Sequence, residues 1–217
     1  ENVSPERVQL LQAYGADIVF TDGSKGSNGA IEVAQQMAQE DENYFMLFQY
    51  GNPANPLAHY ETTGVEILAD LPQVDAFIAG LGTGGTLMGV GRRLKEHNPQ
   101  TQVIAVVPHL GQLVQGLRNL DEGYIPPIVD LSLLDGQILV STRDAFIATR
   151  DLMRHESIFA GVSSGAVVHC ALRLAQRMER GNIVVLLADG GWKYLSSGLW
   201  AKEDHEFDES LEGTVWW

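Results

Sequence analysis

The amino-acid sequence predicts an α/β protein built on a parallel β-sheet that helices cover on both faces. Short apolar runs alternate with amphipathic segments along most of the 217 residues, and the connections between them are short, a pattern typical of β-α-β units. Most of the apolar runs are continuous, which indicates strands buried on both faces. We therefore expect a three-layer arrangement, together with part of a second, smaller α/β domain.

The elements are expected in the following order. A first helix begins at Pro5, with Ser4 as its N-cap, and ends before Gly15, because Ser and Pro favour helix starts and Gly favours helix ends. Apolar residues at helical spacing predict the later helices, at about 30–39, 57–69, 86–97, 142–154 and 165–179. Short apolar runs predict the strands, at 17–20, 45–48, 74–80, 102–107, 138–140 and 182–188.

A domain boundary is expected near YGNPANP, residues 50–56, because two prolines and a glycine cannot continue a helix or a strand. We divide the chain into a smaller part, 1–48, a larger part, 49–200, and an acidic tail, 201–217. The tail ends in two tryptophans, Trp216 and Trp217. Exposed tryptophans usually have a contact partner, so we expect the tail to dock at the mouth of a cleft or onto another protein.

Composition excludes several classes of function. A formal net charge of −14 opposes binding to nucleic acid. The single cysteine, Cys170, excludes an internal disulfide framework and fits a reducing cytoplasm. No apolar run approaches the roughly 18 residues that a membrane-spanning helix needs.

The first informative motif is the glycine-rich loop GLGTGGT, residues 80–86, which lies between a predicted strand and a predicted helix. Such a loop offers backbone N–H groups and the positive end of a helix to a phosphate group. It fits the dinucleotide fingerprint G-x-G-x-x-G, but the next strand ends AVVP without the carboxylate that would hold a ribose. A tight turn that serves only helix–strand packing stays open as the alternative.

The second motif is GVSSG, residues 161–165, which fits the nucleophile elbow of the α/β-hydrolases. Asp189 and His205 follow Ser163 in the order that those hydrolases use. However, the apolar run before the motif is short, and His205 lies in the charged tail. Ser163 as an ordinary helix N-cap is the structural alternative.

Taken together, the two loops resemble the fold-type II pyridoxal-phosphate enzymes, a class with a tryptophan synthase β-like fold, and among them the cysteine synthase family. Within that family, the segment GLRNLDEG at 116–123 is most similar to the branch that uses O-phosphoserine, the cysteine synthase B-like branch. Ordered motifs along most of the chain carry the resemblance: FQYGNPAN at 48–55, GTGGT at 82–86, GVSSGA at 161–166 and ADGGWKYLS at 188–196.

The resemblance implies pyridoxal 5′-phosphate as the cofactor, bound by the large domain 49–200, with 1–48 belonging to a substrate-clamping small domain. Its phosphate would bind the GTGGT loop, which consists of Gly82, Thr83, Gly84, Gly85 and Thr86. Ser163 would hydrogen-bond the pyridine nitrogen, and a neutral hydroxyl there leaves that nitrogen largely unprotonated.

Two further residues would contact the substrate. Gln49 resembles the family glutamine near the substrate carboxylate, although it can equally brace the Asn-Pro turn. Arg118 would hold a substrate phosphate with its planar guanidinium group, and the alternative is a solvated arginine paired with Asp121 or Glu122.

The implied reaction is a β-replacement that makes cysteine from O-phosphoserine or O-acetylserine and a sulfur donor. The resemblance also implies a homodimer and, in the phosphoserine branch, a small thiocarboxylated sulfur-carrier protein as partner. The alternatives are another lyase of the same fold, such as serine/threonine dehydratase or cystathionine β-synthase, or a non-catalytic subunit.

One expected residue is missing. The family binds its cofactor covalently through a lysine, but the four lysines, Lys25, Lys95, Lys193 and Lys202, do not lie in the family context of that residue. The resemblance therefore implies an N-terminally truncated chain that is inactive alone. Asp189 and Lys193 are expected to be structural or to line the cleft rather than to be catalytic.

Overall fold

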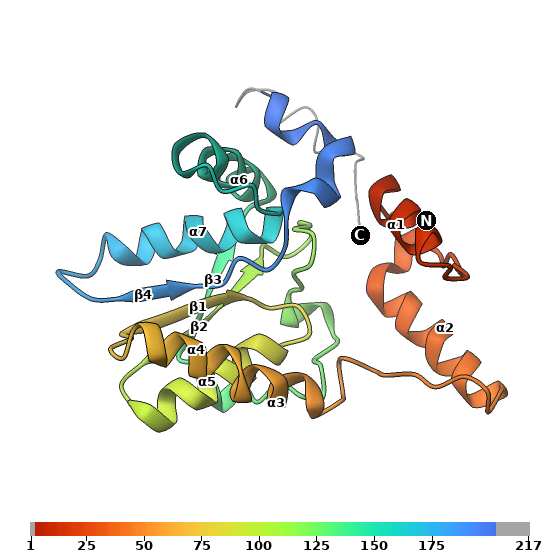
Figure 1. Ribbon diagram of the computed structural model, residues 1–217, viewed down its shortest axis with the longest axis horizontal. Coiled ribbons are helices and arrows are strands. Elements are labelled where there is room, and N and C mark those ends of the chain that lie inside the picture. The colour runs from red at the N-terminus through yellow and green to blue at the C-terminus, as the bar shows by residue number, and fades with distance from the viewer. Residues whose placement is uncertain (1–2, 203–217) are drawn as a thin grey trace.

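The computed structural model describes residues 3–202 as three layers, with a central sheet between two layers of helices (Figure 1). The four strands are all parallel and lie in the order β3-β2-β1-β4. In the described chain the strands are β1 (Ala76–Gly80), β2 (Gln102–Pro108), β3 (Gly136–Val140) and β4 (Ile183–Val185). The sequence prediction of an α/β fold with a parallel sheet is confirmed.

Two groups of helices cover the sheet. The helices α6 and α7 lie on one face, and α3, α4 and α5 lie on the other (Figure 1). The bounds are α3 (Ala54–Glu61), α4 (Thr63–Asp70), α5 (Gly85–His97), α6 (Thr142–Glu156) and α7 (Val162–Ala175). Short 3-10 helices follow in the connections, at Gly23–Lys25, Leu120–Glu122, Leu131–Leu133, Gly191–Ser197 and Leu199–Ala201.

Alternation along β1 distributes the core between the two layers. Phe77 packs with Leu87 and Val90 of α5, whereas Ile78 packs with Ala166 and other residues of α7. Both strand residues are fully buried. Because successive side chains of a strand point to opposite faces, one short apolar run serves both layers, which is why it is continuous in the sequence.

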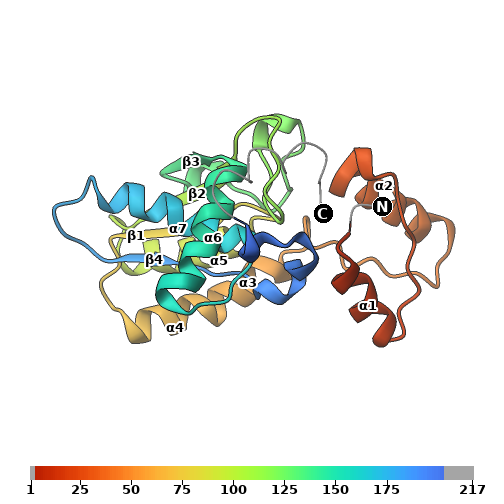
Figure 2. The ribbon, with the colours of Figure 1, turned by 90° about the horizontal axis from the view of Figure 1, so that it is seen from above.

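The N-terminal helices, α1 (Pro5–Ala13) and α2 (Gly26–Glu40), stand beside the sheet and its covering helices (Figures 1 and 2). An irregular segment, 41–53, connects them to α3. Ser4 donates a hydrogen bond from its hydroxyl to the Lys193 carbonyl, 2.9 Å away, and Glu6 accepts hydrogen bonds from Ser196. The start of α1 is therefore attached to the 3-10 helix Gly191–Ser197. The domain division at residue 48 stays a prediction.

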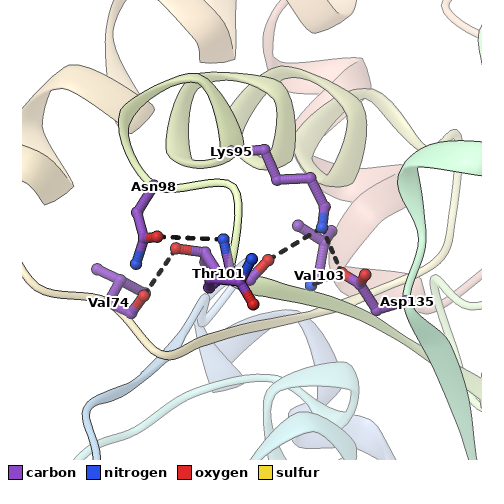
Figure 3. Close-up of polar contacts among 7 residues, drawn as sticks. Val74, Lys95, Asn98, Thr101, Val103 and Asp135 are labelled. Atoms are coloured by element: carbon purple, nitrogen blue, oxygen red, sulfur yellow. Dashed lines mark hydrogen bonds and ion pairs between the residues drawn. The ribbon is translucent and has the colours of Figure 1, made fainter.

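A polar network holds the end of α5 against the start of β2 (Figure 3). Lys95 forms an ion pair with Asp135 at 2.7 Å and donates a hydrogen bond to the Thr101 carbonyl at 3.0 Å. Asp135 also accepts a hydrogen bond from the Val103 amide, and Thr101 donates one to the Val74 carbonyl. These contacts lie at the amino ends of the strands, so Lys95 stabilises the fold far from the edge where the strands end.

Two predicted strands are wrong: residues 17–20 and 45–48 are irregular in the structure. A strand needs a hydrogen-bonded neighbour, and no described segment pairs with either run. Several of their apolar side chains are exposed, with 59% of Val19 and 86% of Phe45 accessible. Apolar composition alone was therefore a misleading signal for these segments.

The predicted helix 57–69 is instead two helices, α3 and α4, which break at Thr62. Thr62 has φ −117° and ψ −81°, and its hydroxyl donates to the Ala58 carbonyl at 2.7 Å. Such back-bonding competes with the regular helix and accompanies bends. None of the described helices is long and apolar enough to cross a membrane.

Candidate functional site

One cavity lies at the carboxyl ends of the strands, where the strand order reverses. The chain runs from β1 outward to β2 and β3, and β4 then returns to the other side of β1. Its volume is about 160 Å³, and it is lined by Gly80 at the end of β1, by Leu186 and Ala188 after β4, and by the start of α7. Open parallel sheets bind ligands at such a reversal of strand order.

The loop between β1 and α5 forms one wall of this cavity, and we call residues 82–86 the phosphate cradle. All five of its residues line the cavity. Gly84 has φ +91° and is the N-cap of α5, a conformation that glycine adopts at low cost. A Cβ atom on Gly82 would lie 2.7 Å from the Gly116 carbonyl oxygen. Glycine is therefore required for the shape of the cradle as well as for backbone access.

Ser163 lines the same cavity. It sits in the first turn of α7 after the N-cap Gly161, and only 7% of the residue is accessible. Its hydroxyl makes no hydrogen bond to any residue in the described part of the chain. The structure thus brings the cradle and Ser163 together around one space, as the resemblance requires for two ends of a single molecule.

A second cavity of about 350 Å³ adjoins the first, and both are lined by Gly82, Gly116 and Leu117. Arg118 and Lys25 lie on the wall of this second cavity. A ligand in the first cavity therefore has a neighbouring space whose wall carries positive charge.

Arg118 lies against two aromatic rings that contact each other edge to face. Its guanidinium carbon lies 4.9 Å from the ring centres of both Tyr50 and Tyr124. The group also donates to the Tyr124 carbonyl at 3.3 Å and lies 3.5 Å from the Asn28 side-chain oxygen. No carboxylate whose side chain is described lies within ion-pair distance of it. The guanidinium is thus oriented without being neutralised by a described acid.

Gln49 is the predicted site residue that the structure does not bring to either cavity. Its side chain is exposed and lines a separate hollow beside α2. Its carbonyl accepts a hydrogen bond from the Asn55 side chain at 2.7 Å. This contact matches the bracing role that was the alternative for Gln49, and contact with a substrate carboxylate stays a prediction.

Asp189 and Lys193 form a structural cluster, as expected. Asp189 accepts a hydrogen bond from the Tyr194 hydroxyl at 2.9 Å and pairs with Lys193 at 3.3 Å. Burial, together with the Asp189 charge, raises the pKa of Tyr194 well above its ordinary value. Asp189 makes no hydrogen bond to Ser163, and His205 lies outside the described residues, so the geometry gives no support to a hydrolase triad.

Asn55 and His59 are the residues that sequence reasoning missed. Both lie on α3, four residues apart, and both contact threonines of the phosphate cradle. The spacing was a usable signal, because residues four apart share one face of a helix. The sequence interpretation considered His59 only as a metal ligand and therefore missed this spacing. The described residues contain no group of three or more possible metal ligands.

With the geometry described, the comparisons identify the family. Residues 1–189 match the family model described as "Pyridoxal-phosphate dependent enzyme". The chain belongs to this family. The cysteine synthase of Aquifex aeolicus is 41% identical over 210 residues, and the match covers 94% of this chain and 64% of that relative. Cysteine synthase A of Escherichia coli is 42% identical over 220 residues, and the match covers 93% of this chain and 68% of that relative. The chain thus spans about two thirds of the length of the curated relatives it matches.

Solved structures agree with this membership. O-ureido-L-serine synthase has a TM-score of 0.83 at 35% identity, covering 95% of this chain and 69% of that one. Cysteine synthase from Entamoeba histolytica also has a TM-score of 0.83, at 32% identity, covering 96% and 66%. The expected fold-type II architecture and the resemblance to cysteine synthases are confirmed.

The residues present fit the cofactor of this family. Pyridoxal phosphate needs donors without bulk for its phosphate and a polar group for its ring nitrogen. The cradle offers three glycines and two threonine hydroxyls at the start of α5, and Ser163 offers, in the same cavity, a hydroxyl without a hydrogen-bond partner among the described residues. Within residues 3–202, no charged side chain lines this cavity, so a phosphate would be held by amides, hydroxyls and the positive end of the helix.

Proposed function

We propose that this chain carries the cofactor and substrate-phosphate sites of a pyridoxal-phosphate dependent enzyme that makes cysteine by β-replacement. The proposed substrate is O-phosphoserine, or O-acetylserine, with a sulfur donor. The single observation that supports this most is that the cradle and Ser163 line one and the same cavity. When bound, the cofactor would draw electron density away from the α-carbon of an amino acid.

The protein's own residues would divide the remaining work. The cradle residues would hold the cofactor phosphate, and the Ser163 hydroxyl would donate to an unprotonated ring nitrogen. Arg118 would hold the substrate phosphate in the adjoining cavity with two parallel N–H groups. A preference for a phosphate leaving group is supported by the guanidinium of Arg118, which Tyr50 and Tyr124 orient and which no described carboxylate neutralises.

Arg118 provides the test. We expect Arg118→Ala to weaken the binding of O-phosphoserine to the cofactor-loaded chain at least tenfold, as measured by isothermal titration calorimetry, since a bidentate charge-assisted pair is lost. Binding of O-acetylserine should not change. Arg118→Lys should recover part of the loss, and Arg154→Ala, an exposed arginine of α6, is the matched control. Equal weakening of both substrates would contradict the phosphate role.

A second candidate function is another lyase of the same fold. An O-acetylserine dependent cystathionine β-synthase from Helicobacter pylori has a TM-score of 0.83 at 33% identity, covering 91% of this chain and 67% of that one. Binding of O-acetylserine in preference to O-phosphoserine would favour this alternative. A non-catalytic subunit would bind the cofactor and neither substrate.

The assembly and its setting are part of the same proposal. We place the enzyme in the cytoplasm as a homodimer, with a small thiocarboxylated carrier protein as sulfur donor. The support is the resemblance of residues 116–123 to the phosphoserine branch and the single, buried cysteine. Light scattering on the purified chain tests the dimer. The expected docking site of the tail concerns residues outside the described part of the chain.

A further inference from the structure

The phosphate cradle is supported from behind by α3. A Cβ atom on Gly89 of α5 would overlap the Pro56 carbonyl oxygen and would lie 2.7 Å from the Cβ of His59. The absence of a side chain at Gly89 therefore lets the two helices approach closely. This approach places Asn55 and His59 against the cradle, although neither residue lines the cavity.

Asn55 fixes the direction of the Thr83 hydroxyl. The Asn55 amide nitrogen donates to the Gln49 carbonyl at 2.7 Å and to Thr83 Oγ1 at 3.1 Å, and the carbonyl partner identifies it as the nitrogen. Thr83 Oγ1 also accepts the Gly85 amide at 3.2 Å. A hydroxyl has two acceptor positions and one proton. Since both acceptor positions are filled, the remaining proton is left for the cavity.

His59 plays the matching role at Thr86. Its Nε2 lies 3.2 Å from Thr86 Oγ1, and its Nδ1 lies 3.0 Å from Thr63 Oγ1. Phosphate oxygens only accept hydrogen bonds, so a Thr86 hydroxyl that donates to phosphate needs a donor behind it. That donor is Nε2–H, and Nδ1 then accepts from Thr63. Burial lowers the pKa of His59, which favours this neutral ring.

We infer that His59 and Asn55 are positioning residues that orient both threonine hydroxyl protons of the cradle toward a phosphate monoester. Thr63 selects the ring tautomer of His59. We call the hydrogen-bonded set of His59, Asn55 and Thr63 the relay. The inference rests on the proposed function, since it assumes that the cavity takes the cofactor phosphate. Its chemistry is specific: the relay acts on the phosphate group and on no other part of the ligand.

The test compares pyridoxal phosphate with pyridoxal, which lacks the phosphate. Binding of both to the purified chain is measured by fluorescence titration. We expect His59→Phe to weaken pyridoxal phosphate binding about tenfold, as for one lost hydrogen bond to a charged group, and to leave pyridoxal binding unchanged. Thr63→Val should act in the same direction, whereas Thr63→Ser, which keeps the hydroxyl, should restore binding. His155→Phe, at an exposed position of α6, is the control.

A double-mutant cycle separates positioning from general support of the fold. If His59 acts through Thr86, then in a Thr86→Val background the change His59→Phe should cost nothing further. Additive losses, unchanged binding in His59→Phe, or equal losses for pyridoxal and its phosphate would each overturn the inference. If the unmodified chain binds neither compound nor inorganic phosphate, the proposed function fails as well, so the two failures are distinguishable.

Discussion

The substitution Gly89→Ala tests how far the cradle depends on the close approach of α3 to α5. In an exposed helix interior, replacing Gly by Ala stabilises the fold by roughly 0.5–1 kcal/mol. Here the new Cβ atom would overlap the Pro56 carbonyl oxygen and would lie 2.9 Å from the Tyr60 amide nitrogen. These contacts belong to the backbone of α3, so no side-chain rotation relieves them.

The two effects oppose each other, and the overlap should dominate. Overpacking a well-filled site typically costs about 1–3 kcal/mol. After the gain in helix propensity is subtracted, we expect the free energy of unfolding to fall by about 1–2 kcal/mol. Because α3 carries Asn55 and His59, its displacement should also weaken the binding of pyridoxal phosphate more than that of pyridoxal.

Urea denaturation followed by circular dichroism measures the first effect, and ligand titration under native conditions measures the second. Gly136→Ala is the control, because a Cβ atom there would meet nothing within 4 Å. A Gly89→Ala protein that is more stable than the original and binds pyridoxal phosphate with equal affinity would refute the reasoning. It would mean that α3 shifts freely and that the cradle does not need it.

Three further predictions concern single groups. Cys170 is fully buried, and burial raises the pKa of its thiol to about 11. In the folded protein only about one thiol in a thousand is ionised at pH 8, so Cys170 should not react with Ellman's reagent until the protein is unfolded. Burial holds the pKa of His59 below its ordinary 6.5, so as the pH falls through 6.5 the unfolded chain takes up a proton at this residue before the folded chain does. The free energy of unfolding should therefore decrease over this pH range, and His59→Phe should remove that part of the decrease in urea titrations. Lys25 forms an ion pair with Glu32 at 3.8 Å, and Lys95 forms one with Asp135. Borohydride reduction in the presence of pyridoxal phosphate should therefore leave no stable pyridoxyl label on these two lysines. A label found by mass spectrometry would contradict the prediction that the covalent lysine is absent.

The sequence was informative wherever a segment forms its structure with neighbours inside this chain. The run 74–80 is buried between α5 and α7, so its continuous apolar pattern correctly indicated a strand. The runs 17–20 and 45–48 have the same composition but no hydrogen-bonding neighbour among the described residues, and they are irregular. Strand formation depends on a partner that a single-sequence pattern does not contain.

The site was predictable to the extent that it is local. The geometry of both glycine loops is predicted by consecutive residues, and in the structure the cradle and Ser163 line one cavity. The contribution of α3 was not predictable in this way, since it depends on Gly89 admitting a helix whose residues are about thirty positions earlier. Gln49 shows the opposite case, because a motif match suggested a site residue, whereas its side chain lines neither of the two cavities and its contact with a substrate stays a prediction.

The two cavities should respond differently to salt, which follows from the kind of group that lines each. In the described part of the chain, no charged side chain lines the cavity formed by the cradle and Ser163, so a phosphate bound there would be held by hydrogen bonds whose strength depends on close geometry. The adjoining cavity has Arg118 and Lys25 on its wall, in a chain of net charge −14. Exposed charge pairs are screened within a Debye length of about 8 Å at physiological ionic strength. Titrations at rising sodium chloride should therefore weaken O-phosphoserine binding clearly and pyridoxal phosphate binding little, and the reverse order would show that long-range charge, rather than hydroxyl and amide geometry, holds the cofactor phosphate.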